Sequence, residues 1–295
     1  MSANRAGVIG NPVSHSLSPV MHNAAYAHLG IDWEYKAIEI EPPNVAEQII
    51  SLFDGGYKGL NITMPYKELA FDLCHPHTQA ARLGTANTLI PGPDGNIHGY
   101  STDGQGFINS LEENDIELRG KTVLVIGAGG ASRSICDALE KARANVFVTS
   151  RKLEKSMEIV TAIVTRRIQN QAETPGSIDV LEFSQRNNFL IQADIVVNAT
   201  PVGMTKGTKI SAEIPVNVDK ITSGHIVVDT IYHPTETALL RGAEERGAKI
   251  FNGIGMLVHQ GALAFNLMTG QEAPIDVMKE AIMAKLAESS PENGN

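Results

Sequence analysis

The sequence has no excess of positive charge and no long apolar run, and both absences limit its possible partners. Its 295 residues include 24 Lys and Arg against 33 Asp and Glu, so the formal net charge is −9. A surface that binds nucleic acid or an anionic membrane normally carries positive charge, so we expect neither partner. The apolar stretches, such as 122–126, have the length of a strand and fall far short of the roughly 20 residues of a membrane span.

Cysteine is also scarce, since Cys74 and Cys136 are the two in the chain. Two cysteines cannot build the disulfide framework of a small secreted protein. The N-terminal segment has neither the basic start nor the apolar stretch of a secretion signal. We therefore expect a soluble, cytoplasmic protein. Its expected assembly is a monomer or a homodimer, a choice that the sequence does not make.

The chain does contain enough apolar material for two domains, because 42% of its residues are hydrophobic and 19% are charged. Short β-branched runs alternate with helical patterns along most of its length, which predicts parallel α/β architecture. Six buried strands after Gly120 predict a complete doubly wound sheet. They span 122–126, 145–149, 178–181, 194–198, 226–231 and 249–251.

Further elements are expected on both sides of this sheet along the chain. Before it, apolar alternation predicts strands at 6–9, 35–40 and 60–64. After it, 256–268 and 277–286 have the spacing of helices but no strands of their own to cover. We therefore expect these two helices to return to the N-terminal domain.

The strongest local motif is a glycine turn between the first strand of the predicted sheet and the helix that follows. Gly127 permits a tight turn, and Gly129 lets a pyrophosphate approach the backbone beside the positive end of the helix dipole. Ser132 stands where the fingerprint has its third glycine. With one strand before it and five after it, the turn indicates a dinucleotide site; a plain strand–helix turn is the alternative.

The loop after the second strand of this sheet is basic. Such a strand ends beside the adenine ribose, where NAD-binding proteins place an acid. Here Thr149 is followed by Ser150, Arg151 and Lys152, with Lys155 one turn later. A hydroxyl and several cations suit a 2′-phosphate, so NADP is the predicted cofactor. A solvated helix start is the alternative, although cations are unfavourable there without an anion.

Lys67 occupies a position that is unfavourable for a purely structural lysine. The alternating apolar residues of 60–64 predict a strand whose other face carries Asn61 and Thr63. Pro65 then opens a helix and puts Lys67 in its first turn, where the dipole disfavours a cation by about 0.3–1 kcal/mol. That misfit suggests a functional amine, with a chance surface position as the alternative.

Two other polar segments belong to the first predicted domain. Asp103 lies at a glycine-flanked strand-to-helix junction, where a carboxylate could assist proton removal in an alcohol oxidation. A helix-capping aspartate is the alternative. Ser14 and Ser16 lie in a loop before a helix and could converge on a small acid, although serine-rich turns are common.

Together these segments resemble the shikimate dehydrogenase family. The resemblance extends over roughly residues 5–285, with the motifs in the family's order. They are Gly10-Asn-Pro-x-Ser-His-Ser-x-Ser-Pro19, Asn61-x-Thr-x-Pro-x-Lys67, Ala86-Asn-Thr88, Ser101-Thr-Asp-Gly104, Gly127-Ala-Gly-Gly-Ala131, Asn198-Ala-Thr-Pro-x-Gly-Met204, Asp229-x-x-Tyr232 and Gly253-x-Gly-Met-Leu-Val-x-Gln260. The resemblance implies an α/β fold in which a Rossmann-type doubly wound NADP domain, 104–255, is inserted into a discontinuous α/β substrate-binding domain. That second domain comprises 1–103 and 256–295, with a cleft between the two.

The resemblance also implies an activity and a set of site residues. The implied reaction is the reversible NADPH-dependent reduction of 3-dehydroshikimate to shikimate in aromatic amino-acid and chorismate biosynthesis. Lys67 is the implied acid/base, paired with Asp103 at the hydroxyl that becomes the ketone. The implied substrate-binding residues are Ser14, Ser16, Thr63, Lys67, Asn87, Asp103, Tyr232 and Gln260. The implied cofactor-binding residues are Gly127, Ala128, Gly129, Gly130, Ala131, Ser150, Arg151, Lys152, Lys155, Thr200, Ile231, Gly253 and Met256.

Three alternatives stay open. The family's NADP-specific loop reads Asn-Arg-Thr-x-x-Arg, whereas this chain has Ser150-Arg-Lys-Leu-Glu-Lys155, so a quinate-active paralogue that uses NAD is one alternative. A non-catalytic ligand sensor on the same fold is another, although such a protein is expected to lose the Lys67 and Asp103 pair. The third is a metal-dependent hydrolase built on Cys74-His75-Pro76-His77; this segment has no second cluster, so we expect no metal.

Overall fold

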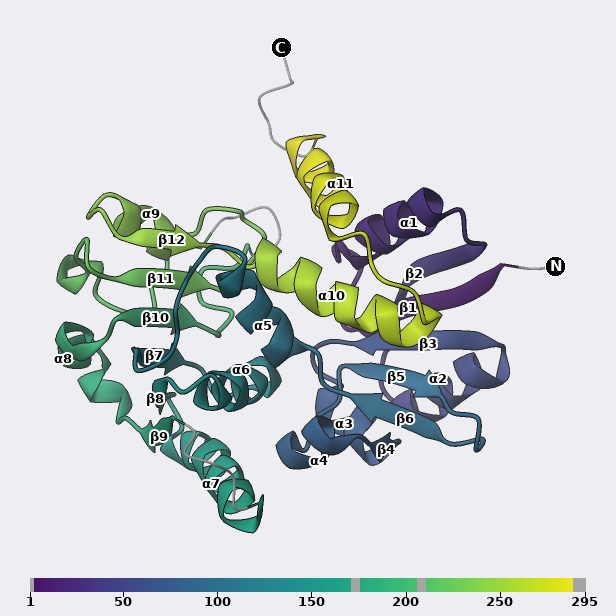
Figure 1. Ribbon diagram of the computed structural model, residues 1–295, viewed down its shortest axis with the longest axis horizontal. Helices are drawn as coiled ribbons and strands as arrows, with labels where there is room; N and C mark the ends of the chain where they lie inside the picture. Colours follow the sequence, from purple (N-terminus) through teal and green to yellow (C-terminus); the bar gives the residue numbers. More distant parts are fainter. Residues whose placement is uncertain (1–2, 171–175, 206–210, 289–295) are drawn as a thin grey trace. The chain divides into compact units, whose positions relative to one another are not determined.

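The computed structural model describes residues 3–170, 176–205 and 211–288. It divides into two compact units, one made of 1–102 and 258–295 and the other of 103–257. Each unit contains a six-stranded sheet (Figure 1). The chain leaves the first unit after Thr102 and returns to it inside helix α10 (Ile254–Thr269).

The sheet of the second unit is parallel throughout, in the order β12-β11-β10-β7-β8-β9. This is the doubly wound order, in which the first and fourth strands lie side by side. The predicted fold class is confirmed, and each predicted strand of this sheet is present. The strands are β7 (Thr122–Ile126), β8 (Asn145–Thr149), β9 (Ser177–Val180), β10 (Ile195–Asn198), β11 (Ile226–Asp229) and β12 (Lys249–Phe251).

The central strand β7 is buried on both faces. Val123 and Val125 belong to one apolar core, whereas Leu124 and Ile126 belong to a second. Successive side chains of a strand point to opposite faces, so a strand covered on both sides has an unbroken apolar sequence. The helices of this unit are α5 (Asp103–Glu112), α6 (Gly130–Lys141), α7 (Leu153–Asn170), α8 (Arg186–Phe189) and α9 (Ala238–Glu244), with 3-10 turns at Phe183–Gln185, Leu190–Gln192 and Val218–Lys220.

The sheet of the first unit is mixed, in the order β2-β1-β3-β5-β6-β4. The neighbours of β1 run parallel to it, whereas β5 is antiparallel to both β3 and β6. Its strands are β1 (Asn4–Gly10), β2 (Trp33–Glu39), β3 (Tyr57–Ile62), β4 (His75–Pro76), β5 (Thr88–Pro91) and β6 (Ile97–Tyr100). The sequence predicted the first three strands and missed the others, which have four residues or fewer and little alternation.

The first unit contains helices from both ends of the chain. In Figure 1, α11 lies beside α1, and the two helices are in contact. Gly261 of α10 allows another close approach, because a Cβ there would lie 2.1 Å from Cε of Met21. The helices are α1 (Ser18–Leu29), α2 (Val45–Asp54), α3 (Lys67–Asp72), α4 (Thr78–Leu83), part of α10, and α11 (Ile275–Glu288).

The predicted strand at 60–64 extends too far. Strand β3 ends at Ile62, and a turn over 63–66 separates it from α3, which begins at Lys67 rather than at Pro65. Met64 lies in this turn with 59% of its surface exposed. The position of Lys67 in the first helical turn is confirmed.

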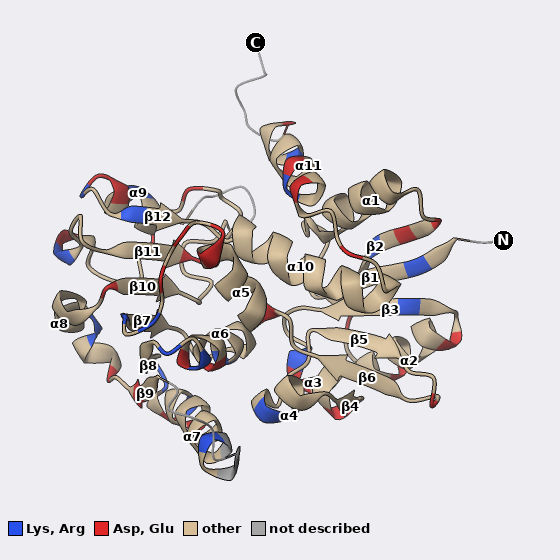
Figure 2. Ribbon diagram, viewed as in Figure 1, with Lys and Arg blue, Asp and Glu red and all other residues tan. Residues whose placement is uncertain are grey.

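Charged residues of both signs occur on the elements of each unit (Figure 2). Within 3–170, 176–205 and 211–288, no helix has the length and apolar character needed to cross a bilayer.

Helix α5 packs against α6 through a glycine that cannot easily be replaced. A Cβ on Gly104 would lie 2.2 Å from the carbonyl oxygen of Ser134 and 3.0 Å from Cβ of Ala138. We expect Gly104→Ala to lower the free energy of unfolding by about 3 kcal/mol, because the helices must move apart. Urea denaturation measures this loss. Gly224→Ala is the control, since its Cβ would lie 3.7 Å from the nearest atom and should change stability by less than about 0.5 kcal/mol.

Candidate functional site

In the first unit, four polar segments meet at one end of the strands, where β1, β3 and β6 end and β5 begins. Strands β1 and β3 are parallel, so the loop after Gly10 and the turn after Ile62 leave from the same end. The Asn11 amide donates to the Met64 carbonyl at 3.1 Å, and a Cβ on Gly10 would lie 2.5 Å from Cγ2 of Thr63. Antiparallel β5 begins at this end and β6 ends there, which adds 86–88 and 100–102.

Asn61 is buried at this end of the sheet, and both the oxygen and the nitrogen of its side-chain amide are hydrogen-bonded. The Tyr35 hydroxyl donates to Oδ1 of Asn61 at 2.7 Å, and Nδ2 of Asn61 donates to Oγ1 of Thr88 at 2.9 Å. The Tyr35 ring stacks on His22, with their ring centroids 4.1 Å apart. Burial lowers the pKa of His22 to about 3, so the imidazole is neutral. Asn61 therefore ties β2, β3 and β5 together at this end of the sheet.

Asn87 and Gln260 are brought together from opposite ends of the sequence. Nδ2 of Asn87 donates to Oγ1 of Thr102 at 2.9 Å and lies 3.5 Å from Oε1 of Gln260. The Thr102 amide donates back to Oδ1 of Asn87 at 2.8 Å, and its hydroxyl lies 3.5 Å from the same Gln260 oxygen. These three side chains form a polar cluster that fits a hydroxylated ligand.

The other candidates of the first unit lie on neighbouring segments. Ser14 is exposed and Ser16 half-buried in the loop after β1, where Oγ of Ser16 accepts from the Ser18 amide at 3.3 Å. Lys67 and Thr63 are half-buried on either side of the turn after β3. The Lys67 carbonyl accepts from the Ala86 amide at 3.0 Å, which ties the helix start to the Asn87 segment.

Asp103 is the first residue of α5 and is counted with the second unit, where it is 5% exposed. Tyr232 also belongs to the second unit and is half-buried, and burial raises the pKa of its hydroxyl. The two residues follow β6 and β11 along the chain.

The glycine turn of the second unit follows the central strand β7. Gly127 has φ +121°, and a Cβ there would lie 2.6 Å from the Ala199 carbonyl oxygen, so the fold itself requires glycine. Gly129 precedes α6 and is exposed, and a Cβ there would meet nothing within 4 Å. Ala128, Gly130 and Ala131 complete the turn and are half-buried. The open space at Gly129, beside the N-terminus of α6, suits a phosphate group.

A buried carboxylate organises the loops after β10 and β11. Oδ1 of Asp229 accepts from Nδ2 of Asn198 at 3.0 Å and from the Ile231 amide at 3.1 Å, and Oδ2 accepts from Oγ1 of Thr237 at 2.8 Å. Oδ1 of Asn198 in turn accepts from the amide and hydroxyl of Thr200. Thr200 and Ile231, two predicted cofactor residues, are thus held by one network.

Gly253 and Met256 lie just after β12. A Cβ on Gly253 would lie 2.2 Å from the Thr230 carbonyl oxygen, so backbone packing already demands a glycine there. Met256 is half-buried against the core that contains Val123.

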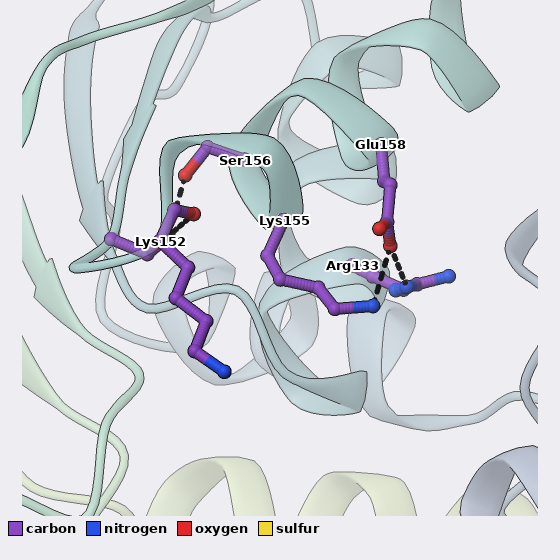
Figure 3. Close-up of polar contacts among 6 residues, drawn as sticks. Arg133, Lys152, Lys155, Ser156 and Glu158 are labelled. Carbon is purple, nitrogen blue, oxygen red and sulfur yellow. Dashed lines mark hydrogen bonds and ion pairs between the residues drawn. The ribbon is translucent and has the colours of Figure 1, made fainter.

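Hydrogen bonds and ion pairs that the sequence did not predict hold the basic loop and the start of the helix after it (Figure 3). The Ser150 hydroxyl donates to the Lys152 carbonyl at 2.7 Å and lies 2.8 Å from the Ser156 hydroxyl. Lys155 and Arg133 both pair with Oε2 of Glu158, at 2.9 and 3.0 Å. In the described part of the chain, the side chains of Arg151 and Lys152 take part in no ion pair.

Several residues of these sites were missed by sequence reasoning. Arg133 comes from α6, four residues after Gly129, and its charge could have been noticed there. Thr102, Asn198 and Asp229 lie within the quoted motifs but were given no role. Their roles depend on partners that are distant in sequence, such as Gln260 for Thr102, and no local pattern identifies such partners.

The segment 74–77 forms a different surface cluster. Sγ of Cys74 lies 3.4 Å from the Phe71 carbonyl oxygen, and burial raises the pKa of the thiol to about 11, so it is protonated at neutral pH. Nε2 of His77 lies 3.1 Å from Nδ1 of His98, whose Nε2 lies 2.9 Å from Oδ1 of Asp94. Among the described residues, no group of three His, Cys, Asp or Glu side chains has the geometry to hold a metal.

Comparison with protein-family models finds three matches. The model "Shikimate dehydrogenase substrate binding domain" matches residues 8–89. The model "Shikimate / quinate 5-dehydrogenase" matches 110–206, and "Shikimate 5'-dehydrogenase C-terminal domain" matches 253–283.

Individual proteins match over nearly the whole chain. The shikimate dehydrogenase (NADP(+)) of Methanosarcina mazei is 39% identical over 282 residues, which cover 95% of this chain and 98% of that protein. A crystal structure of a shikimate dehydrogenase in complex with NADP+ has a TM-score of 0.86 and 35% identity, covering 96% of both chains. Quinate dehydrogenase from Corynebacterium glutamicum, in complex with NAD, has a TM-score of 0.84 and 27% identity, covering 96% of this chain and 100% of that one.

The buried carboxyl of Asp229 predicts a pH-dependent stability. Burial raises its pKa from 3.8 to about 6, so the folded state binds this proton more tightly than the unfolded state does. Its contribution to stability is therefore full below the unfolded pKa and is lost as the pH rises through about 6. On acidification from about pH 7.5 to 4.5, wild type should gain about 2 kcal/mol relative to Asp229→Asn.

Urea denaturation of both proteins across this pH range measures the difference. Asp179→Asn, at an exposed strand position, is the control and should run parallel to wild type. A constant difference between wild type and Asp229→Asn at every pH would contradict the assignment.

Proposed function

Because the chain belongs to the shikimate dehydrogenase family, we propose that it catalyses the reversible NADPH-dependent reduction of 3-dehydroshikimate to shikimate, a step of aromatic amino-acid biosynthesis by way of chorismate. It is an oxidoreductase that acts on a CH–OH group and uses NADP. The observation that carries this proposal is the full-length similarity to NADP-dependent shikimate dehydrogenases. The polar cluster of the first unit, and separately the glycine turn and basic loop of the second, agree with it.

The residues of the second unit fit the cofactor. A side chain at position 129 would meet open space, so packing does not require a glycine there. A glycine is expected there if a pyrophosphate approaches the backbone closely. Arg151 and Lys152 supply cations where the 2′-phosphate of NADP is expected. We propose Gly127, Ala128, Gly129, Gly130, Ala131, Ser150, Arg151, Lys152, Lys155, Thr200, Ile231, Gly253 and Met256 as the cofactor-binding residues. When bound, the nicotinamide exchanges a hydride with the substrate.

Residues of the first unit, with Asp103 and Tyr232 of the second, are the proposed ligands of a small hydroxylated acid. Ser14 and Ser16 are proposed to bind the carboxylate, together with Tyr232. Thr63, Asn87, Asp103 and Gln260 are proposed to bind the ring hydroxyls, a role supported by the Asn87, Thr102 and Gln260 cluster, whose amide groups can both donate and accept.

Lys67 and Asp103 are the proposed catalytic pair. In the oxidation direction, Nζ of Lys67 would accept the proton of the hydroxyl while the hydride on the same carbon passes to the oxidised nicotinamide, so that the C–O single bond becomes the C=O bond of the ketone. In the reduction, Nζ returns the proton to the oxygen. Asp103 orients the hydroxyl and the amine. A non-catalytic sensor would not need both groups.

We also propose a cytoplasmic enzyme that acts as a monomer or a homodimer. Support for the compartment comes from Cys74 and Cys136, both of which are free thiols.

The direct test is an assay of the reduced nicotinamide's absorbance that crosses shikimate and quinate with NADP+ and NAD+. We expect the highest kcat/KM with shikimate and NADP+. The quinate dehydrogenase with NAD shows that this fold also accommodates the other pair. Turnover with quinate and NAD+ alone would overturn the proposal, and no turnover in any combination by folded protein would favour the sensor.

The role of Lys67 can be tested separately. Lys67→Ala should lower kcat by a factor of at least ~10² with little change in the KM for shikimate, because general acid–base catalysis is lost while binding groups remain. Lys58→Ala is the matched control, since Lys58 is an exposed lysine on β3 of the same unit. A Lys67→Ala enzyme with near wild-type kcat would exclude the role.

A further inference from the structure

We propose that Glu158 is a specificity-determining residue that limits the preference of the cofactor site for NADP over NAD. It does so by pairing with two of the cations that would otherwise act on the 2′-phosphate. The inference rests on the proposed function, because it assumes that the loop after β8 receives the adenosine end of a dinucleotide.

One carboxylate oxygen links cations from two different helices. Oε2 of Glu158 lies 2.9 Å from Nζ of Lys155 on α7 and 3.0 Å from Nη2 of Arg133 on α6. In Figure 3 both side chains reach Glu158, whereas the Lys152 side chain extends away from it. Two cations can share so small a region because an anion lies between them. The hydrogen bond from Lys155 also holds the pKa of Glu158 below its usual value, so the carboxyl is ionised at neutral pH.

These helices border the place where a dinucleotide's adenosine end is expected. The Gly127 amide donates to the Thr149 carbonyl at 2.8 Å, which sets the glycine turn beside the end of β8. Arg133 is the fourth residue of the helix that follows the glycines, and Lys155 is the third residue of the helix that follows Thr149. The ion pairs therefore bridge the two helix starts of the candidate cofactor site.

The charges of this region determine how strongly it attracts a 2′-phosphate, and Glu158 reduces that attraction. Arg133, Arg151, Lys152 and Lys155 supply four positive charges, and Glu154 and Glu158 supply two negative ones. Glu158 pairs with both Arg133 and Lys155 and offsets one of their two charges, whereas Arg151 and Lys152 take part in no ion pair and keep their full charge for a phosphate. A 2′-phosphate gains from every available cation, whereas the 2′-hydroxyl of NAD gains little. An acid paired with these cations therefore reduces the affinity for NADP more than that for NAD.

The Ser150 hydroxyl does not compensate for the pairing of Arg133 and Lys155 with Glu158. Its hydroxyl proton is used by the Lys152 carbonyl, and Ser156 occupies one side of its oxygen. A bound 2′-phosphate would have to take over that proton before Ser150 could donate to it, so the discrimination between the two cofactors depends mainly on the cations.

Isothermal titration calorimetry with NADP+ and NAD+ tests this inference on wild type and Glu158→Gln. Removing one negative charge near a dianion should lower the Kd for NADP+ roughly five- to tenfold while the Kd for NAD+ changes less than about twofold. The gain should shrink at high salt, because half-exposed charges are screened. The ratio of kcat/KM values for NADP+ and NAD+ with shikimate should rise by the same factor.

Glu154→Gln is the matched control. Glu154 is an exposed acid in the first turn of the same helix, and it takes part in none of these ion pairs. Its replacement changes the net charge equally and should shift the Kd for NADP+ less than Glu158→Gln does. Equal effects of the two variants would overturn the inference, because pairing would then be irrelevant.

Two further results would also be decisive. If Glu158→Gln weakens NADP+ binding or leaves the ratio unchanged, then Glu158 does not oppose the phosphate and the inference is wrong. If wild type binds both dinucleotides but oxidises neither shikimate nor quinate, the proposed function fails while the shift in Kd can still support the inference. If wild type binds neither dinucleotide, both fail.

Discussion

The candidate sites depend on buried polar side chains at the ends of strands, all of which must find hydrogen-bond partners inside the protein. A buried polar group that lacks a partner costs roughly 1–3 kcal/mol, so the loops around it adopt the conformations that supply one. In the first unit Asn61 and Asn87 have this position, and in the second Asn198 and Asp229 do. The same bonds that satisfy these groups fix the segments that contain Thr102, Thr200 and Ile231.

Much of the fold could be predicted from the sequence, because the parallel sheet of the second unit is buried on both faces. Strands such as 122–126 are then unbroken apolar runs and are easily identified. The first unit was harder. The strand β4 has two residues, and β6 contains His98 and Gly99, so neither has the alternation on which a prediction rests. The turn at 63–66 was missed because Met64 continues the apolar alternation of the strand before it.

The residues of the candidate sites also fall into two groups, those that could be predicted from the sequence and those that could not. The glycine turn and the basic loop could be located because each is a contiguous motif with a known relation to a strand end. Gln260 meets Asn87 and Thr102 from positions 158 or more residues away, and the role of Asp229 depends on three donors from different segments. Arg133 and Glu158 belong to this second class, since only the packing of α6 against α7 makes them neighbours.

The basic loop also explains how a protein of net charge −9 can present a site for a dianion. Lys152 and Lys155 lie at the start of α7, where the helix dipole disfavours cations. Without a counter-ion, these two lysines therefore destabilise the start of the helix. Glu158 provides one from within the same helix and so stabilises the protein without its cofactor. An arriving 2′-phosphate has to compete with that carboxylate. In the proposed site, the stability of the unliganded loop and the affinity for a phosphorylated cofactor are therefore opposed through Glu158, and cofactor preference would depend on the ion pairs as well as on the number of basic residues.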